Sequence, residues 1–180
     1  MNAVSARVAA TLKQLRGERR WSLGDTAQFT GVSKAMLGQI ERGESSPTVA
    51  TLWKIATGFG VPFSQFIRLD VGPPQALPAA PQAMRVTPVF PWDATLGFEM
   101  LRLWLPPGAR SESAPHAVGT VEHVLVESGT LWLTIDGTLR VLAAGEGERF
   151  AADVAHGYEN RGAVPLKFHN IIHYPRGGRA

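Results

Sequence analysis

The chain of 180 residues contains no cysteine, which excludes disulfide bonds and thiolate metal ligands. It also contains no run of the roughly 18 apolar residues that a membrane-spanning helix needs. The N-terminal stretch MNAVSARVAATLKQLR lacks the apolar segment of a secretory signal peptide. We therefore expect a cytoplasmic protein with no membrane partner.

The motifs of several enzyme classes are missing as well. The sequence shows no nucleophile motif, phosphate-binding loop or dinucleotide fingerprint, and the stretch GEGERF at 145–150 lacks the strand–loop–helix context that a phosphate loop requires. Hydrophobic residues make up 44% of the chain, which is enough for a packed core and argues against global disorder.

Positive charge is concentrated in the first part of the chain. Residues 1–70 hold nine Lys/Arg and five Asp/Glu, whereas residues 85–180 hold nine Lys/Arg and ten Asp/Glu. A basic excess in the N-terminal part is what phosphate binding requires, although the excess is modest.

Two short helices joined by a tight turn are predicted in the stretch Ser22–Arg42. Ser22 and Asp25 have the three-residue spacing of a capping box, and Ser33 can cap the second helix. Gly31 falls between the two apolar patterns, where the turn requires a positive φ. This is the pattern of a helix–turn–helix motif.

The second helix, residues 33–41, is predicted to recognise DNA. Leu37 and Ile40 point inward, while small residues, one cation and one amide lie on the other face. Lys34 and Gln39 are the predicted base contacts, because lysine reaches guanine acceptors and glutamine can bond adenine in two places. With the hydroxyl and guanidinium groups expected at phosphates, the predicted DNA-binding set is Ser22, Ser33, Lys34, Ala35, Gly38, Gln39 and Arg42.

Roughly residues 5–68 resemble the DNA-binding domain of the XRE family, which includes the phage repressors. The resemblance is most specific in the stretch GVSKAMLGQIERGESSPTVATLWKIATGFGV. The turn, the IERG exit and the following PTVATLWKIA helix occur together. The resemblance implies a five-helix, lambda-repressor-like domain and an ion pair between Arg16 and Glu41. The alternative is a helical hairpin that only packs against the rest of the chain.

Residues 71–83 separate two parts of different character. They contain four prolines and no charge, as an extended and fairly stiff linker does. From Arg85 onward, short runs of period two alternate with Gly, Pro or Asp, which predicts seven or more strands in a sandwich or small barrel. Asp136-Gly137 predicts a two-residue hairpin. The predicted α + β chain thus has two domains, a helical one over 1–70 and an all-β one over 84–180.

Two segments of the β domain resemble the two motifs of the cupin family, within about residues 86–174. The first, HAVGTVEHVLVESG, contains His116 and Glu122, and the second, GEGERFAADVAHGYEN, contains His156. The resemblance implies a double-stranded β-helix, a jelly-roll barrel. Metal-binding cupins usually use two histidines and a glutamate from the first motif and one histidine from the second. Here Val118 takes the place of the second histidine and cannot ligate.

The cupin resemblance therefore leaves three metal ligands, His116, Glu122 and His156. Two imidazoles and a carboxylate can bind Zn²⁺, Fe²⁺ or Mn²⁺ with water in the open positions. A metal-free pocket, in which these side chains bond a ligand or each other, is the alternative. The ligand pocket is predicted to include Arg102, Trp104, Val118 and Tyr158, and an inward Arg102 would suit an anionic ligand.

An XRE domain followed by a cupin resembles a known family of bacterial regulators. It implies a sequence-specific transcriptional regulator that binds a palindromic operator as a homodimer and senses a small-molecule effector in its barrel. The alternative is a mononuclear-iron cupin oxygenase or epoxidase with an XRE-like N-terminal domain. Those enzymes place three residues between the first histidine and the glutamate, whereas five lie between His116 and Glu122. This difference favours the regulator, and we predict no catalytic residue. A protein-binding, antitoxin-like repressor leaves the barrel unexplained.

Overall fold

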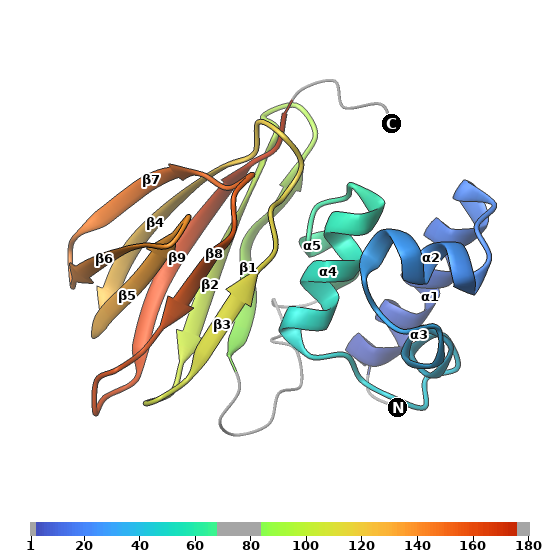
Figure 1. Cartoon of the computed structure of the whole chain (residues 1–180), viewed down its shortest axis with the longest axis horizontal. Helices are drawn as coiled ribbons and strands as arrows, with labels where there is room; N and C mark the ends of the chain where they lie inside the picture. The colour runs from blue at the N-terminus through green and yellow to red at the C-terminus, as the bar shows by residue number, and fades with distance from the viewer. Residues whose placement is uncertain (1–2, 68–83, 176–180) are drawn as a thin grey trace.

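The computed structural model describes residues 3–67 and 84–175, which form a helical part and a β part packed side by side (Figure 1). The predicted linker, residues 71–83, lies outside the described residues. No helix in the described part of the chain is long and apolar enough to cross a membrane. Within these residues the helical part contains α1 (Ala3–Arg19), α2 (Leu23–Thr30), α3 (Lys34–Glu41), α4 (Val49–Phe59) and α5 (Ser64–Ile67).

Polar caps and glycines set the ends of the helices, as the sequence predicts. The Ser22 hydroxyl accepts a hydrogen bond from the Asp25 backbone N–H, and the Asp25 carboxylate accepts one from the Ser22 N–H, which completes the capping box before α2. The Ser33 hydroxyl caps α3 by accepting a hydrogen bond from the Met36 backbone N–H. Gly31 ends α2 with a φ of 64°, a conformation that residues with a side chain rarely adopt. Local sequence therefore fixes the turn between α2 and α3.

The β part is a jelly-roll barrel of two antiparallel sheets, as the cupin resemblance implies. The five-stranded sheet has the order β1 (Arg85–Asp93), β2 (Phe98–Leu105), β9 (Leu166–His173), β4 (Val121–Ser128) and β7 (Gly147–Ala151). The four-stranded sheet has the order β3 (Arg110–Ser113), β8 (His156–Glu159), β5 (Thr130–Ile135) and β6 (Thr138–Ala143).

The sequence pattern predicts most of these strands but not β3 and β8. Their sequences, RSES and HGYE, are four residues long and lack apolar alternation, so tertiary pairing rather than local propensity forms them. The hairpin between β5 and β6 is confirmed. Asp136 and Gly137 have φ angles of 46° and 74°, the two positive values that a type I′ turn requires.

A buried carboxylate joins the two parts of the molecule. Glu99 on β2 accepts hydrogen bonds from the backbone N–H groups of Phe63 and Ser64, at 2.9 and 2.8 Å, and from the Tyr174 hydroxyl. Burial raises the pKa of Glu99, while these hydrogen bonds oppose the rise. Through this and neighbouring contacts, α5 lies against β1 and α4 lies against β3 (Figure 1).

Candidate DNA-binding surface and metal centre

The exposed face of α3 is the candidate DNA-binding surface. Lys34, Ala35 and Gln39 are exposed, while Leu37 and Ile40 on the opposite side are fully buried. The buried side chains hold α3 against α1 and α2. Three of the predicted DNA contacts are therefore presented to solvent on a helix with a fixed position.

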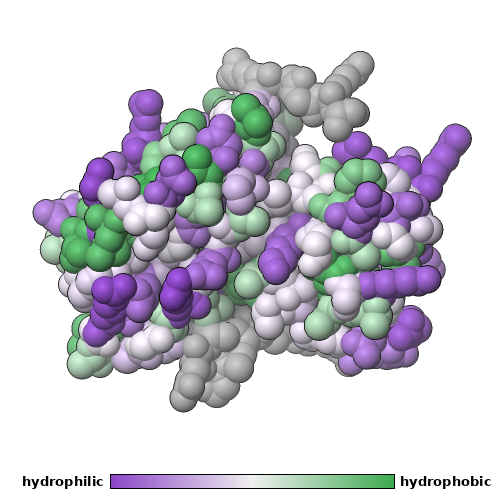
Figure 2. All heavy atoms as spheres, viewed as in Figure 1, coloured by the Kyte–Doolittle hydropathy of each residue, from purple (hydrophilic) through white to green (hydrophobic). Residues whose placement is uncertain are grey.

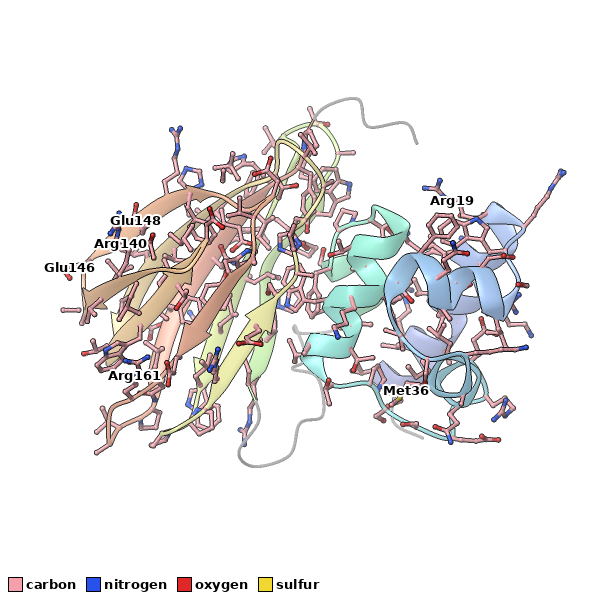
Figure 3. The ribbon with its side chains drawn as sticks, in the orientation of Figure 1. Arg19, Met36, Arg140, Glu146, Glu148 and Arg161 are labelled. Carbon is pink, nitrogen blue, oxygen red and sulfur yellow. The ribbon has the colours of Figure 1, made fainter. Side chains whose placement is uncertain are left out.

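Two further residues of α3, Gly38 and Met36, lie at or beside this surface. Gly38 is buried, and a Cβ at this position would lie 3.1 Å from Arg42 Nη1 and 3.7 Å from Leu23 Cδ1. The nearer of these atoms is the end of the Arg42 side chain, which is itself a predicted DNA contact, so the DNA contact of Gly38 stays a prediction. Met36 is 37% exposed (Figure 3). Its apolar side chain gave no signal for a DNA contact.

The predicted phosphate contacts lie at the ends of the two helices and are all exposed. The hydroxyls of Ser22 and Ser33 accept hydrogen bonds from backbone N–H groups, which leaves each with a proton to donate. Arg42 forms an ion pair with Glu44 at 2.6 Å, but its side chain remains 59% exposed. These three groups border the α3 surface.

An ion pair fixes the end of α3. The Arg16 guanidinium on α1 donates to both carboxylate oxygens of Glu41, at 2.6 and 3.0 Å, and to the Trp21 carbonyl at 3.0 Å. The Arg16 and Glu41 side chains are only 24% and 10% exposed. Two parallel bonds make this a strong pair. The pair that the XRE resemblance implies is present and ties α1 to the recognition helix.

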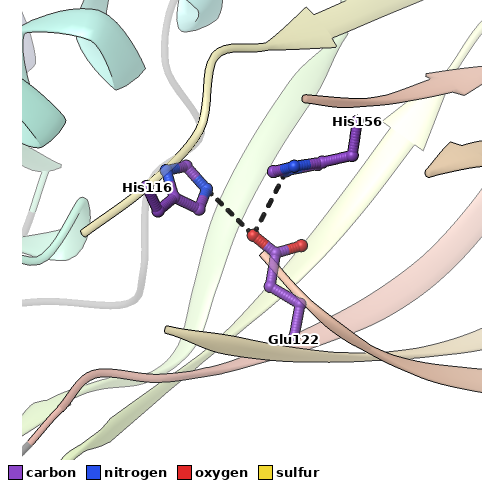
Figure 4. A group of neighbouring side chains, drawn as sticks. All are labelled: His116, Glu122 and His156. Carbon is purple, nitrogen blue, oxygen red and sulfur yellow. Dashed lines mark hydrogen bonds and ion pairs between the residues drawn. The ribbon is translucent and has the colours of Figure 1, made fainter. Parts of the chain in front are cut away.

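The three predicted metal ligands converge at the end of the barrel that faces α4 (Figure 4). His116 lies in the loop between β3 and β4, Glu122 on β4, and His156 at the start of β8. Glu122 Oε1 lies 3.0 Å from His116 Nε2 and 3.6 Å from His156 Nε2. One ligand atom from each residue lies within 4.8 Å of the others. Three separate elements thus supply one compact donor set.

The hydrogen bonds of His156 leave one of its nitrogens free for a metal. Its Nδ1 lies 2.8 Å from the Val154 carbonyl, which can only accept, so Nδ1 carries the proton. The buried Nε2 has no hydrogen-bond partner and faces Glu122. A lone pair oriented by a bond at the other nitrogen is the usual state of a metal-binding histidine. With His116 and Glu122 beside it, His156 completes a donor set of two imidazoles and a carboxylate that fits a divalent metal.

Glu122 is held from both sides. Its Oε2 accepts hydrogen bonds from the Tyr158 hydroxyl and, at 2.8 Å, from the Asn170 amide. Burial opposes ionisation, but His116 and His156 outweigh it and hold the pKa of Glu122 well below its ordinary value. Although burial lowers it, the pKa of His156 is raised by the same carboxylate. Tyr158, which is predicted from the sequence to line the ligand pocket, therefore contacts the cluster, and Asn170 is a neighbour that the sequence did not reveal.

Arg102 and Trp104, which are predicted from the sequence to line the ligand pocket, lie on the outer face of β2. Arg102 is on the outer face, with a side chain 55% exposed and 3.6 Å from Glu127, and Trp104 shares that face beneath the Arg85 guanidinium. Leu101 and its alternate neighbours point inward. Large apolar side chains occur on both faces of this strand. The alternation of residues therefore shows which side chains share a face, but it does not show which of the two faces is buried. Arg102 and Trp104 are therefore not part of the barrel pocket.

Val118 also lies outside the barrel. It is 85% exposed and lines a cavity of about 360 Å³ between α4 and the loop that carries His116. Two residues of α4 reach the cluster here. The Thr57 hydroxyl lies 3.2 Å from His116 Nδ1, and the Trp53 ring lies with its centroid 5.2 Å from the imidazole. A threonine and a tryptophan in a helix give no sequence signal for such a role.

Comparisons with known proteins match both parts. The helix-turn-helix family model matches residues 12–66, and the cupin domain model matches residues 102–172. The HTH-type transcriptional regulator SutR of Escherichia coli K12 is 56% identical over 174 residues, 94% of this chain and 96% of SutR. The crystal structure of an HTH_3 family transcriptional regulator from Vibrio cholerae has a TM-score of 0.85 at 42% identity, covering 96% of this chain and 97% of that chain. A Cupin_2 domain of an XRE family transcriptional regulator from Enterobacter cloacae is 53% identical, with a TM-score of 0.52 over 53% of this chain and 100% of that chain.

Proposed function

Because this chain belongs to the XRE-type helix-turn-helix transcriptional regulators with a C-terminal cupin domain, we propose that it is a sequence-specific DNA-binding regulator whose barrel senses a small-molecule effector. The observation that carries the proposal is the exposed face of α3. Lys34 and Gln39 project from a helix whose other side is buried and whose end is fixed by Glu41. A role on genomic DNA agrees with the cytoplasmic location expected from the sequence.

We propose a sensing rather than a catalytic role for the barrel. His116, Glu122 and His156 would hold a divalent metal such as zinc, iron or manganese, with Tyr158 and Asn170 fixing the carboxylate. A metal in this site would supply a Lewis acid to which an effector with an oxygen or nitrogen donor could bind. The iron oxygenase alternative is disfavoured by the five-residue gap in the first cupin motif, and no catalytic residue is assigned.

The base-contact residues are tested on DNA selected from a random pool by the full chain. Lys34→Ala and Gln39→Ala are each expected to weaken binding to the selected site by about 1–3 kcal/mol, because each removes hydrogen bonds to a base edge. Fluorescence anisotropy measures the affinity. On scrambled DNA, Gln39→Ala should bind as tightly as the wild type. Equal losses on both DNAs would remove Gln39 from the set that reads the sequence.

We propose a homodimer held through the barrel, residues 84–180, with the DNA-binding parts projecting from it. Leu125, Leu139 and Val141 on the barrel strands are 51%, 43% and 53% exposed. Figure 2 shows hydrophobic side chains gathered at the end of the barrel farthest from the helices. Pairing two barrels would cover such side chains and the sheet edges. A two-fold dimer would also place two α3 helices in successive major grooves of a palindromic operator, roughly 34 Å apart.

Light scattering tests the dimer. The full chain at tens of micromolar is expected to show twice the mass of one chain. A Leu139→Glu, Val141→Glu double variant should shift the mass toward the monomer, because it places charge in the proposed interface. A wild-type monomer at this concentration would contradict the proposal.

A further inference from the structure

His116 is the point at which the candidate metal centre meets the DNA-binding part. Its Nε2 faces Glu122 Oε1 at 3.0 Å, and its Nδ1 lies 3.2 Å from the Thr57 hydroxyl on α4. The ring also lies against Trp53, with centroids 5.2 Å apart. Both nitrogens of one imidazole are therefore engaged, one by the barrel and the other by the helical part.

The two hydrogen bonds of His116 cannot change independently. With Nε2 facing the Glu122 carboxylate, which only accepts, a neutral ring carries its proton on Nε2 and accepts from the Thr57 hydroxyl at Nδ1. If Nε2 held a metal, the proton would lie on Nδ1, and the ring would donate to the Thr57 oxygen. Metal binding at the cluster would thus reverse a hydrogen bond that crosses to α4. The Thr57 hydroxyl is then free to donate to the helix carbonyl four residues earlier.

From Thr57 the contacts continue to the recognition helix. The next residue, Gly58, packs so closely on the end of α2 that a Cβ there would lie 2.7 Å from the Phe29 carbonyl oxygen and from the Thr30 Cα. The Thr30 hydroxyl in turn accepts a hydrogen bond, at 3.3 Å, from the backbone N–H of Val32 in the turn that leads into α3. The packing leaves no gap between α4 and the end of α2 here, so a displacement of α4 would act directly on the helix–turn–helix motif.

We infer that Thr57 and Trp53 are positioning residues for the metal ligand His116, and that occupancy of the His116–Glu122–His156 cluster is coupled through α4 to DNA binding. This inference rests on the proposed regulator function, and it states how the site would communicate with the DNA surface. Coupling of this kind is reciprocal: if metal changes the affinity for DNA, then DNA changes the affinity for metal by the same factor.

The test uses the full chain, Zn²⁺ as the probe, and the pair Thr57→Val and Thr57→Ser. Valine keeps the shape of threonine without the hydroxyl, whereas serine keeps the hydroxyl. Competition with a chromophoric chelator should show Zn²⁺ binding about 10- to 100-fold weaker in Thr57→Val, the range found for outer-shell partners of metal ligands. Thr57→Ser should bind like the wild type. Equal Zn²⁺ affinity in wild type and Thr57→Val would overturn the positioning role.

The coupling is measured as the ratio of DNA affinities with and without saturating Zn²⁺. For the wild type a change of roughly 5- to 150-fold is expected, and Thr57→Val should bring the ratio close to one. A second measurement on the wild type alone, the Zn²⁺ affinity with and without the selected DNA, should give the same factor. Specific DNA binding that is indifferent to Zn²⁺ would overturn this inference but leave the proposed function standing. The absence of any specific DNA binding would instead overturn the proposed function.

Discussion

Replacing Glu122 with glutamine is expected to lower the Zn²⁺ affinity of the full chain by at least about 100-fold, more than the loss of an outer-shell partner produces. Glu122 Oε1 is the atom toward which both imidazoles point, at 3.0 and 3.6 Å, and an amide supplies no negative charge to the metal. Glutamine still accepts a hydrogen bond from Tyr158, so the barrel should remain folded. Chelator competition measures the affinity, and a thermal melt verifies the fold.

Glu127→Gln is the matched control for this prediction. It changes the same residue type on the same strand, β4, but its carboxylate lies on the outer face beside Arg102. Its Zn²⁺ affinity should equal that of the wild type. If Glu122→Gln also binds Zn²⁺ as the wild type does, the cluster is not the metal centre, and the metal-free hydrogen-bonded pocket becomes the better interpretation.

Replacing Glu41 with alanine is expected to lower the free energy of unfolding of the helical part by about 3 kcal/mol or more. The change leaves the partly buried Arg16 guanidinium without the carboxylate that binds two of its nitrogens. The pair joins α1 to the end of α3, so its loss should also loosen the recognition helix. Urea denaturation of the full chain, followed by circular dichroism at a helical wavelength, measures the effect.

Glu44→Ala is the control for the ion pair. Glu44 makes an equally short ion pair with Arg42, but both side chains are more than half exposed. Solvent and salt screen such a pair, so the denaturation midpoint should not change measurably. A Glu41→Ala midpoint equal to that of Glu44→Ala would show that the Arg16–Glu41 pair contributes no more than a surface contact.

The helical part could be predicted closely because its signals are local. Ser22 and Asp25 form a capping box within one turn, and Gly31 meets the positive φ of the turn it occupies. The hairpin at Asp136-Gly137 is local in the same sense. For such features the short-range sequence contains most of the relevant physical constraints.

The metal cluster could be selected only through the spacing of the two cupin motifs, since its residues lie on three elements far apart in sequence. The features that the sequence could not reveal depend on how surfaces face each other. The orientation of Arg102 on β2 follows from which side of the sheet closes the barrel. The roles of Glu99 and Thr57 arise only when the helical part packs on the barrel. No period or spacing along the chain encodes that packing.

The most direct test of the central claim is the ratio of affinities of the full chain for its selected DNA site and for a scrambled duplex of the same length at one salt concentration. A sequence-specific regulator is expected to prefer its site by at least about 10³-fold. The double variant Lys34→Ala, Gln39→Ala should lose most of this preference while keeping its affinity for scrambled DNA within about tenfold, since one phosphate-reaching cation is also removed. Equal affinity of the wild type for the two duplexes would contradict the claim that this protein reads DNA sequence.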